Sequence, residues 1–185
     1  MVQIKGTAVL DTIRAVKKRA GDDGYDKIVS LLDDETKKVF LGEISPSSWY
    51  PLDAFTRFLE VEIRESANGN EEVLIQGAEA VIERQLRGIY KVFVRLGSPE
   101  FVIKRIAAVH ATYFTGASVE VHMPDSRRAM IKYGGFEKQH RIMEYVIIGF
   151  FRKALEISGA ENVETYFATP IEEGKGYAEL AITWS

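Results

Sequence analysis

The sequence predicts an α+β fold in which an N-terminal helical layer packs on a mainly antiparallel, four-stranded sheet. Two observations predict this fold. Apolar residues in the first half recur at steps of three and four, the helical period, whereas residues 98–185 read as helix, hairpin, helix, hairpin. No repeat or linker separates the halves, and 185 residues suffice to bury one core. We therefore expect a single domain, residues 1–185, with a helical part (1–97) and an α/β part (98–185).

The helices of the first half follow from apolar spacing and its stop signals. Val9, Ile13 and Val16 share one helical face, and Gly21 is a typical helix stop. Pro51 suits the first position of another helix, because no partner is needed there for an N–H group. The pattern predicts further helices over residues 25–32, 51–63 and 73–96, the last with a break at Gly88.

The second half opens with a strong helix start. Ser98 is a capping residue, Pro99 suits the first turn, and Glu100 faces the positive end of the helix dipole. The helix extends to a stop at Gly116, and His110 lies on its apolar face. A histidine on such a face is either a hydrogen-bonded core residue or a polar group placed in a binding site.

Alternation of apolar and polar residues predicts the sheet. Val119, Val121 and Met123 alternate with polar neighbours, and this period of two is typical of a half-buried strand. A polar turn leads to a return strand over residues 129–133. A helix is expected over 138–158, and a second hairpin pairs residues 163–167 with 178–184, where Trp184 lies on the apolar side.

Composition excludes several classes of function. The net charge of -3 and the pI near 5.7 argue against a nucleic-acid surface, which needs a concentrated basic face. The chain has no cysteine, so disulfides, thiolate nucleophiles and zinc–thiolate sites are excluded. We find no signal-like start and no run of about 20 apolar residues, and we expect a cytoplasmic protein without a membrane span. Basic residues near the N-terminus are expected on the solvent-exposed face of the first helix: Lys5, Arg14, Lys17, Lys18 and Arg19.

Several segments resemble a known superfamily. They are Ile4-Lys-Gly, Ala107-Ala-Val-His, Arg128-Ala-Met-Ile-Lys-Tyr, Gly149-Phe-Phe-Arg-Lys-Ala-Leu-Glu and the terminal Leu-Ala-Ile-Thr-Trp. Together with the order of elements, they resemble the haem nitric-oxide/oxygen-binding (H-NOX) domain. They also resemble its haem-free relatives, which are the 4-vinyl-reductase sensor domains and an uncharacterised bacterial family of about this length. The resemblance spans most of the chain.

The resemblance also implies which branch of the superfamily the chain is nearest to. His110 matches the axial histidine of the haem-binding branch, but Tyr133-Gly-Gly-Phe-Glu137 stands where that branch has Tyr-x-Ser-x-Arg to hold the haem propionates. The proline that follows the histidine helix in that branch is absent. The cysteine-based zinc site of 4-vinyl-reductase sensors is also absent, since the chain has no cysteine. Ser48-Trp-Tyr-Pro-Leu52 and the tryptophan near the C-terminus place the chain nearest the uncharacterised haem-free family, so no cofactor is expected.

The function implied is that of a ligand-sensing module. We expect a small hydrophobic or aromatic ligand between the N-terminal helices and the sheet, and a separate signalling protein as its partner. The candidate ligand-binding residues are His110, Tyr113, Phe114, Trp49, Phe55, Tyr90 and Tyr133. No metal ligand is expected, except His110 if haem is bound.

Alternatives from other classes stay open. One is a haem-based gas (NO/O₂) sensor through His110, and another is a ligand-free interaction scaffold, for which a homodimer is one form. An enzyme is not expected, because the sequence lacks a nucleophile elbow, a phosphate loop and a His-Glu-x-x-His motif. Glu60, Glu62 and Glu65 are expected to form a charged helix face, and His122 and His140 to be solvated.

Overall fold

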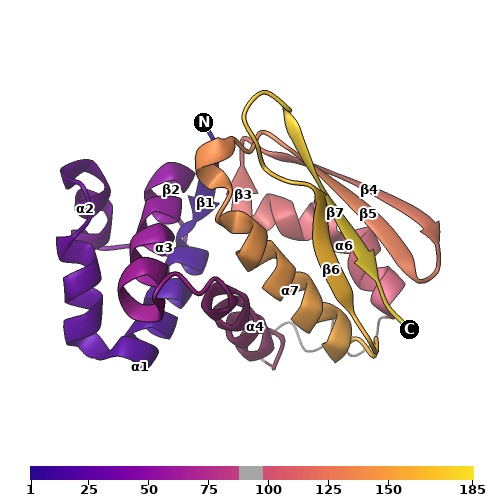
Figure 1. Ribbon diagram of the computed structural model, residues 1–185, viewed down its shortest axis with the longest axis horizontal. Helices are drawn as coiled ribbons and strands as arrows, with labels where there is room; N and C mark the ends of the chain where they lie inside the picture. The colour runs from indigo at the N-terminus through magenta and orange to yellow at the C-terminus, as the bar shows by residue number, and fades with distance from the viewer. Residues whose placement is uncertain (88–97) are drawn as a thin grey trace.

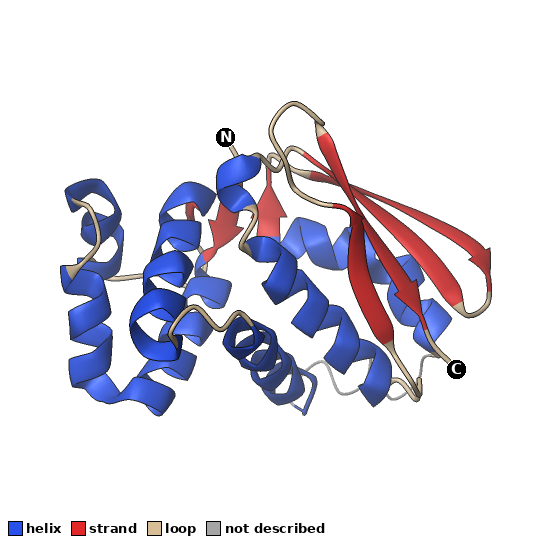
Figure 2. Ribbon diagram, in the orientation of Figure 1, coloured by secondary structure: helices blue, strands red, loops and turns tan. Residues whose placement is uncertain are grey.

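The computed structural model describes residues 1–87 and 98–185 and confirms the α+β class. Figures 1 and 2 show a helical group at the N-terminal end and a twisted antiparallel sheet at the C-terminal end, with further helices between them. The helices are α1 (Gly6–Ser30), α2 (Asp34–Leu41), α3 (Leu52–Ala67), α4 (Glu72–Arg87), α6 (Pro99–Tyr113), the 3₁₀ helix η1 (Lys138–His140) and α7 (Met143–Ile157). Neither the predicted break at Gly88 nor the rest of the predicted helix up to residue 96 lies within the described residues.

The four-stranded sheet matches the two predicted hairpins. It contains β4 (Ser118–Asp125), β5 (Arg128–Gly134), β6 (Glu164–Thr169) and β7 (Tyr177–Thr183) in the order β4-β5-β7-β6, with every pairing antiparallel. Ile131 pairs with Val121 on one side and Leu180 on the other. Ile131 and Leu180 are fully buried under α6 and α7, which lie on one face of the sheet (Figure 2). The period-two pattern therefore identified the covered face correctly.

The N-terminal layer is built from α1, α2 and α3. Gly21 has φ of 75° and breaks α1 where the sequence predicted a stop, so the two predicted helices form one kinked element. Helix α2 was not predicted. Its N-cap is Asp33, whose side chain accepts a hydrogen bond from the backbone N–H of Thr36 at 2.9 Å. With only eight residues, α2 is too short to show a clear apolar period.

A second, smaller sheet connects the N-terminal helical layer to the C-terminal half of the chain. This sheet was not predicted from the sequence. Strand β1 (Gln3–Lys5) pairs with β2 (Trp49–Pro51) on one side and with β3 (Phe114–Thr115) on the other. Because β3 directly follows α6, β1 ties the N-terminal layer to the end of the helix that carries His110. Strands of two or three residues give no alternation that sequence reasoning can detect.

Helices α4 and α7 pack closely along each other. Gly149 of α7 lies against α4 so tightly that a Cβ there would overlap the carbonyl oxygen of Ile75 and lie 2.9 Å from the Cβ of Ala78. The predicted helix over 138–158 is divided at this end of the molecule, because η1 comes first and α7 begins at Met143. Within the described ranges, 1–87 and 98–185, no helix is long and apolar enough to cross a membrane.

Candidate functional site

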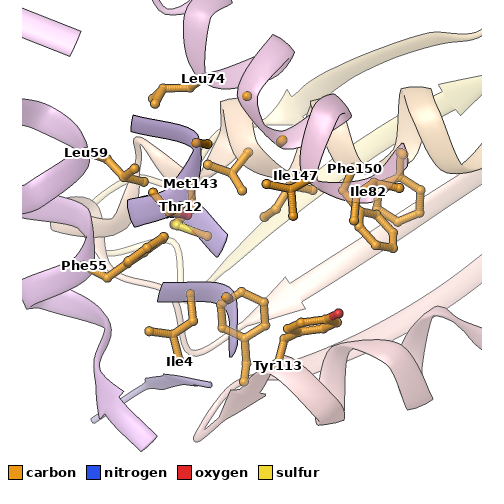
Figure 3. Close-up of a pocket in the computed structure, with 18 of the residues that line it drawn as sticks. Ile4, Thr12, Phe55, Leu59, Leu74, Ile82, Tyr113, Met143, Ile147 and Phe150 are labelled. Carbon is orange, nitrogen blue, oxygen red and sulfur yellow. The ribbon is translucent and has the colours of Figure 1, made fainter. Parts of the chain in front are cut away.

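A cavity of about 140 Å³ lies where the N-terminal helices meet the C-terminal half. Its wall combines side chains from α1, α3 and α4 with side chains from α6, α7, β1 and β5. Figure 3 shows several of the apolar residues that converge on it: Ile4, Phe55, Leu59, Leu74, Ile82, Met143, Ile147 and Phe150. The polar side chains on this wall are Thr12, Arg19, Glu62, His110, Tyr113 and Tyr133.

His110 lies on the cavity wall and is buried, with 7% of its surface exposed. Its ring stacks on Phe114 at 4.9 Å between centroids and lies 5.8 Å from the ring of Tyr133. The Nε2 atom of His110 has no hydrogen-bond partner among the residues that the structure describes. Burial lowers the pKa of His110 to about 4, so the imidazole is neutral at pH 7. A neutral ring with an unused nitrogen can bind a ligand donor, a ligand acceptor or a metal.

Glu62 is the second unusual group on the wall, and the exposed position predicted for it is wrong. We predicted a charged face from Glu60, Glu62 and Glu65, but Glu62 is only 2% exposed. Its Oε1 accepts a hydrogen bond from Arg19, while Oε2 has no partner within the described part of the chain. Burial raises the pKa of Glu62, and the guanidinium of Arg19 opposes that shift.

The signal that could have found Glu62 is its spacing. Phe55, Leu59 and Glu62 follow one another at steps of four and three, so Glu62 continues the apolar stripe of α3. Arg19 also differs from its prediction, because its side chain is 34% exposed and reaches from α1 to the buried carboxylate. An acidic residue on an apolar stripe and a basic residue on the facing helix are consistent with a buried ion pair.

The structure brings most of the predicted site residues together. His110, Tyr113, Phe114, Phe55 and Tyr133 all line the cavity. Trp49 does not: it lies in β2, where the ammonium of Lys5 is 4.4 Å from the ring centroid. Tyr90 lies outside the described residues. The role of the five lining residues in binding a ligand stays a prediction.

His140 was expected to be solvated, and that prediction is wrong. It is 2% exposed, and its Nε2 lies 2.6 Å from Oδ1 of Asp53 at the start of α3. Its Nδ1 accepts the backbone N–H of Glu137 at 2.9 Å, so the ring proton lies on Nε2 and is donated to Asp53. This contact, which we call the Asp53–His140 link, joins the N-terminal layer to η1. The ring of Phe136 lies 6.0 Å from that of His140 and 6.3 Å from that of His110.

Comparison with known proteins identifies the fold. No protein-family model matches the sequence, and no curated protein is significantly similar to it. Among solved structures, the chain is similar to the Fe(II) unliganded H-NOX protein from K. algicida (16% identity, TM-score 0.73), covering 98% of this chain and 96% of that one. A mutant of the T. tengcongensis H-NOX protein gives 16% identity, a TM-score of 0.69 and coverage of 98% and 97%. An oxygen-binding H-NOX domain related to soluble guanylate cyclases gives 13% identity and a TM-score of 0.68, and the match covers 98% of this chain and 95% of that one. The fold is therefore H-NOX-like.

A solved structure of similar fold concerns haem distortion in the H-NOX family, and haem would need an axial ligand and partners for its two carboxylates here. The neutral imidazole of His110, with Nε2 unpartnered among the described residues, suits an axial ligand. The described cavity lining does not supply a free cationic side chain for the two haem carboxylates. Arg19 is the one lysine or arginine among the described residues that line the cavity, and it is already paired with Glu62. A carboxylate that enters this largely apolar cavity without a cation would be strongly disfavoured. The residues present therefore fit the imidazole requirement of haem but not its carboxylates.

Proposed function

We propose that this chain is a sensor module that binds a small hydrophobic or aromatic ligand in the cavity, without catalysis. The observation that carries the proposal is an apolar cavity of about 140 Å³ with a buried imidazole on its wall, whose Nε2 has no partner in the described residues. An apolar cavity of about 150 Å³ is known to bind benzene. The volume thus suits a small aromatic ligand, and His110 is a polar group that can orient it.

The position of the cavity suggests how binding would be transmitted. One side of its wall belongs to α1 and α3, and the other to α6 and α7 together with α4, which packs along α7. A ligand that contacts both sides stabilises the packing that holds them together, and so shifts the population of packings. Strand β1 and the Asp53–His140 link join the same two parts of the molecule and limit how they can move. A separate signalling protein would detect the shift.

A haem-based gas sensor through His110 is the second candidate. The H-NOX proteins of similar fold and the unused Nε2 of His110, as judged over the described chain, favour it. The chemistry of the carboxylates opposes it, because Arg19 is committed to Glu62. The two candidates are distinguished by native mass spectrometry of protein purified from haem-supplemented cells. A bound mass equal to haem, lost in His110→Ala, would establish the second candidate in place of the first.

Thermal unfolding with and without benzene tests the first candidate directly. A ligand that binds only the native state raises the unfolding temperature as its concentration rises. We expect benzene to stabilise the wild type but not Gly77→Leu, because Gly77 lines the cavity and a Cβ at this position has open space around it. Gln76→Leu is the matched control, since Gln76 is exposed on the same helix. An equal shift in all three proteins would show binding elsewhere and contradict the proposal.

A further inference from the structure

We propose that the ligand is a neutral aromatic molecule with a hydrogen-bond donor, and that this donor binds Oε2 of Glu62. The inference rests on the proposed function and adds the chemical class of the ligand. Three buried side-chain atoms lack a hydrogen-bond partner in the described residues, and Glu62 Oε2 and His110 Nε2 are two of them. Both belong to residues that line the cavity. Their occurrence on one cavity wall indicates a site that is completed by a bound molecule.

Glu62 has one buried side-chain oxygen, Oε2, that lacks a hydrogen-bond partner among the described residues. Arg19 donates to Oε1, and a second contact from the same guanidinium nitrogen reaches the hydroxyl of Ser66 at 3.3 Å. Ser66 in turn donates to the backbone carbonyl of Glu62 at 2.6 Å. These contacts fix the residue on α3 while Oε2 stays without a partner in the parts of the chain described. An ionised carboxylate only accepts hydrogen bonds, so the missing partner is a donor.

The charges of Arg19 and Glu62 determine the net charge that the ligand can carry. Arg19 already compensates Glu62, so a ligand ammonium would add an unbalanced positive charge to a largely apolar cavity, and a carboxylate would add a negative one. A neutral N–H or O–H group satisfies Oε2 without changing the charge. His110 does not set this preference, because a neutral imidazole Nε2 is a donor in one tautomer and an acceptor in the other.

Indole and benzofuran form a matched pair of probes. They share a bicyclic shape, but indole has an N–H where benzofuran has an oxygen. Dissociation constants are measured by calorimetry on the wild-type chain. Since a hydrogen bond to a charged group is stronger than an ordinary one, we expect indole to bind about tenfold more tightly than benzofuran. Benzylamine, which carries an ammonium at pH 7, is expected to bind more weakly than indole.

Glu62→Gln tests the residue itself. Arg19 will hold the amide oxygen of the glutamine, so the NH₂ group takes the position of Oε2 and presents a donor. We expect the preference for indole to fall to about one in this variant and to persist in Glu60→Gln, because Glu60 is exposed on the same helix and does not line the cavity. The wild-type comparison of the two probes needs no variant, so the test does not depend on how well Glu62→Gln folds.

Each outcome bears on a different part of the account. Equal affinity of indole and benzofuran for the wild type would overturn the inference and leave the proposed apolar site intact. A preference that persists in a folded Glu62→Gln would show that another group meets the donor, and would overturn the role of Glu62. Tighter binding of benzylamine than of indole would overturn the neutral class. Failure of all probes to bind would overturn the proposed function together with the inference.

Discussion

At the scale of single residues, the cavity is defined by two polar groups on otherwise apolar helix faces. His110 on α6 and Glu62 on α3 are both buried, and each has one atom without a hydrogen-bond partner in the described chain. An unsatisfied buried polar atom costs roughly 1–3 kcal/mol, and a ligand that supplies the partner recovers part of that cost. The two residues thus give the cavity a chemical preference that apolar side chains alone do not.

The protonation of His110 gives a pH-dependent prediction. Its pKa is about 4 in the folded chain and 6.5 when unperturbed, so protonation favours the unfolded chain. The wild type is expected to lose stability as the pH falls from 6.5 to 4, by roughly 2–3 kcal/mol from this group. His110→Leu should remove that part of the pH dependence. The free energy of urea unfolding at several pH values measures it.

His122→Leu is the control for this experiment, because His122 is exposed on β4. The control removes a histidine without changing the cavity, so it should follow the wild type through the acidic range. If His110→Leu also keeps the full wild-type loss of stability between pH 6.5 and 4, His110 is not a buried neutral imidazole. The electrostatic description of the site would then be wrong.

The burial of these residues was only partly predictable from the sequence. The apolar stripe of residues 99–113 placed His110 on a covered face, and the structure agrees. Glu62 and His140 were predicted to be exposed, because charged and titratable side chains are usually solvated. What decides their burial is the partner: Arg19 from α1 and Asp53 from α3 are distant in sequence, and no local pattern specifies such pairings.

At the scale of elements, α4 and α7 define one side of the cavity through two glycines in opposite situations. A Cβ at Gly149 would overlap the carbonyl oxygen of Ile75, whereas a Cβ at Gly77 has no heavy atom within 4 Å. The first glycine permits close packing of the two helices, and the second leaves part of the cavity empty. The difference between the two sites cannot be read from the helical pattern alone, because both lie in regular helix.

Alanine at each glycine should therefore have opposite effects. Gly77→Ala is expected to stabilise the chain by about 1 kcal/mol, since alanine is the better helix former and meets no obstacle. Gly149→Ala is expected to destabilise it by roughly 1–3 kcal/mol, because α4 must shift away from α7. Urea unfolding of both variants measures the two effects. Equal effects of the two substitutions would contradict the described packing of α4 on α7.

Elements with a clear period were the predictable part of the fold. The two long hairpins and the helices α3 and α6 follow from alternation and helical spacing, although α6 ends at Tyr113, before the predicted stop at Gly116. Helix α2 and strands β1, β2 and β3 were missed because they are short and depend on tertiary contacts. Yet β1 bears on the proposed function, since it connects the N-terminal layer to the end of the helix that carries His110.

At the scale of the whole molecule, the H-NOX-like fold places a cavity between two parts of the chain that are linked at its edge. The wall of the cavity draws on both parts, while β1 and the Asp53–His140 link connect them beside it. This arrangement supplies a physical basis for the sensor that we propose, because a ligand that fills the space changes the relative stability of alternative packings. That the chain is a single domain stays a prediction from its sequence.

Nuclear magnetic resonance of the methyl-labelled chain with benzene shows whether, and where, an apolar ligand binds. Ligand-to-methyl nuclear Overhauser effects locate the bound ring without any substitution. We expect effects to methyl groups on both sides of the cavity, including Leu59 of α3, Ile82 of α4 and Ile147 of α7. Effects confined to exposed methyl groups such as those of Leu41, or no effects at benzene concentrations that saturate an apolar cavity, would contradict the proposed site.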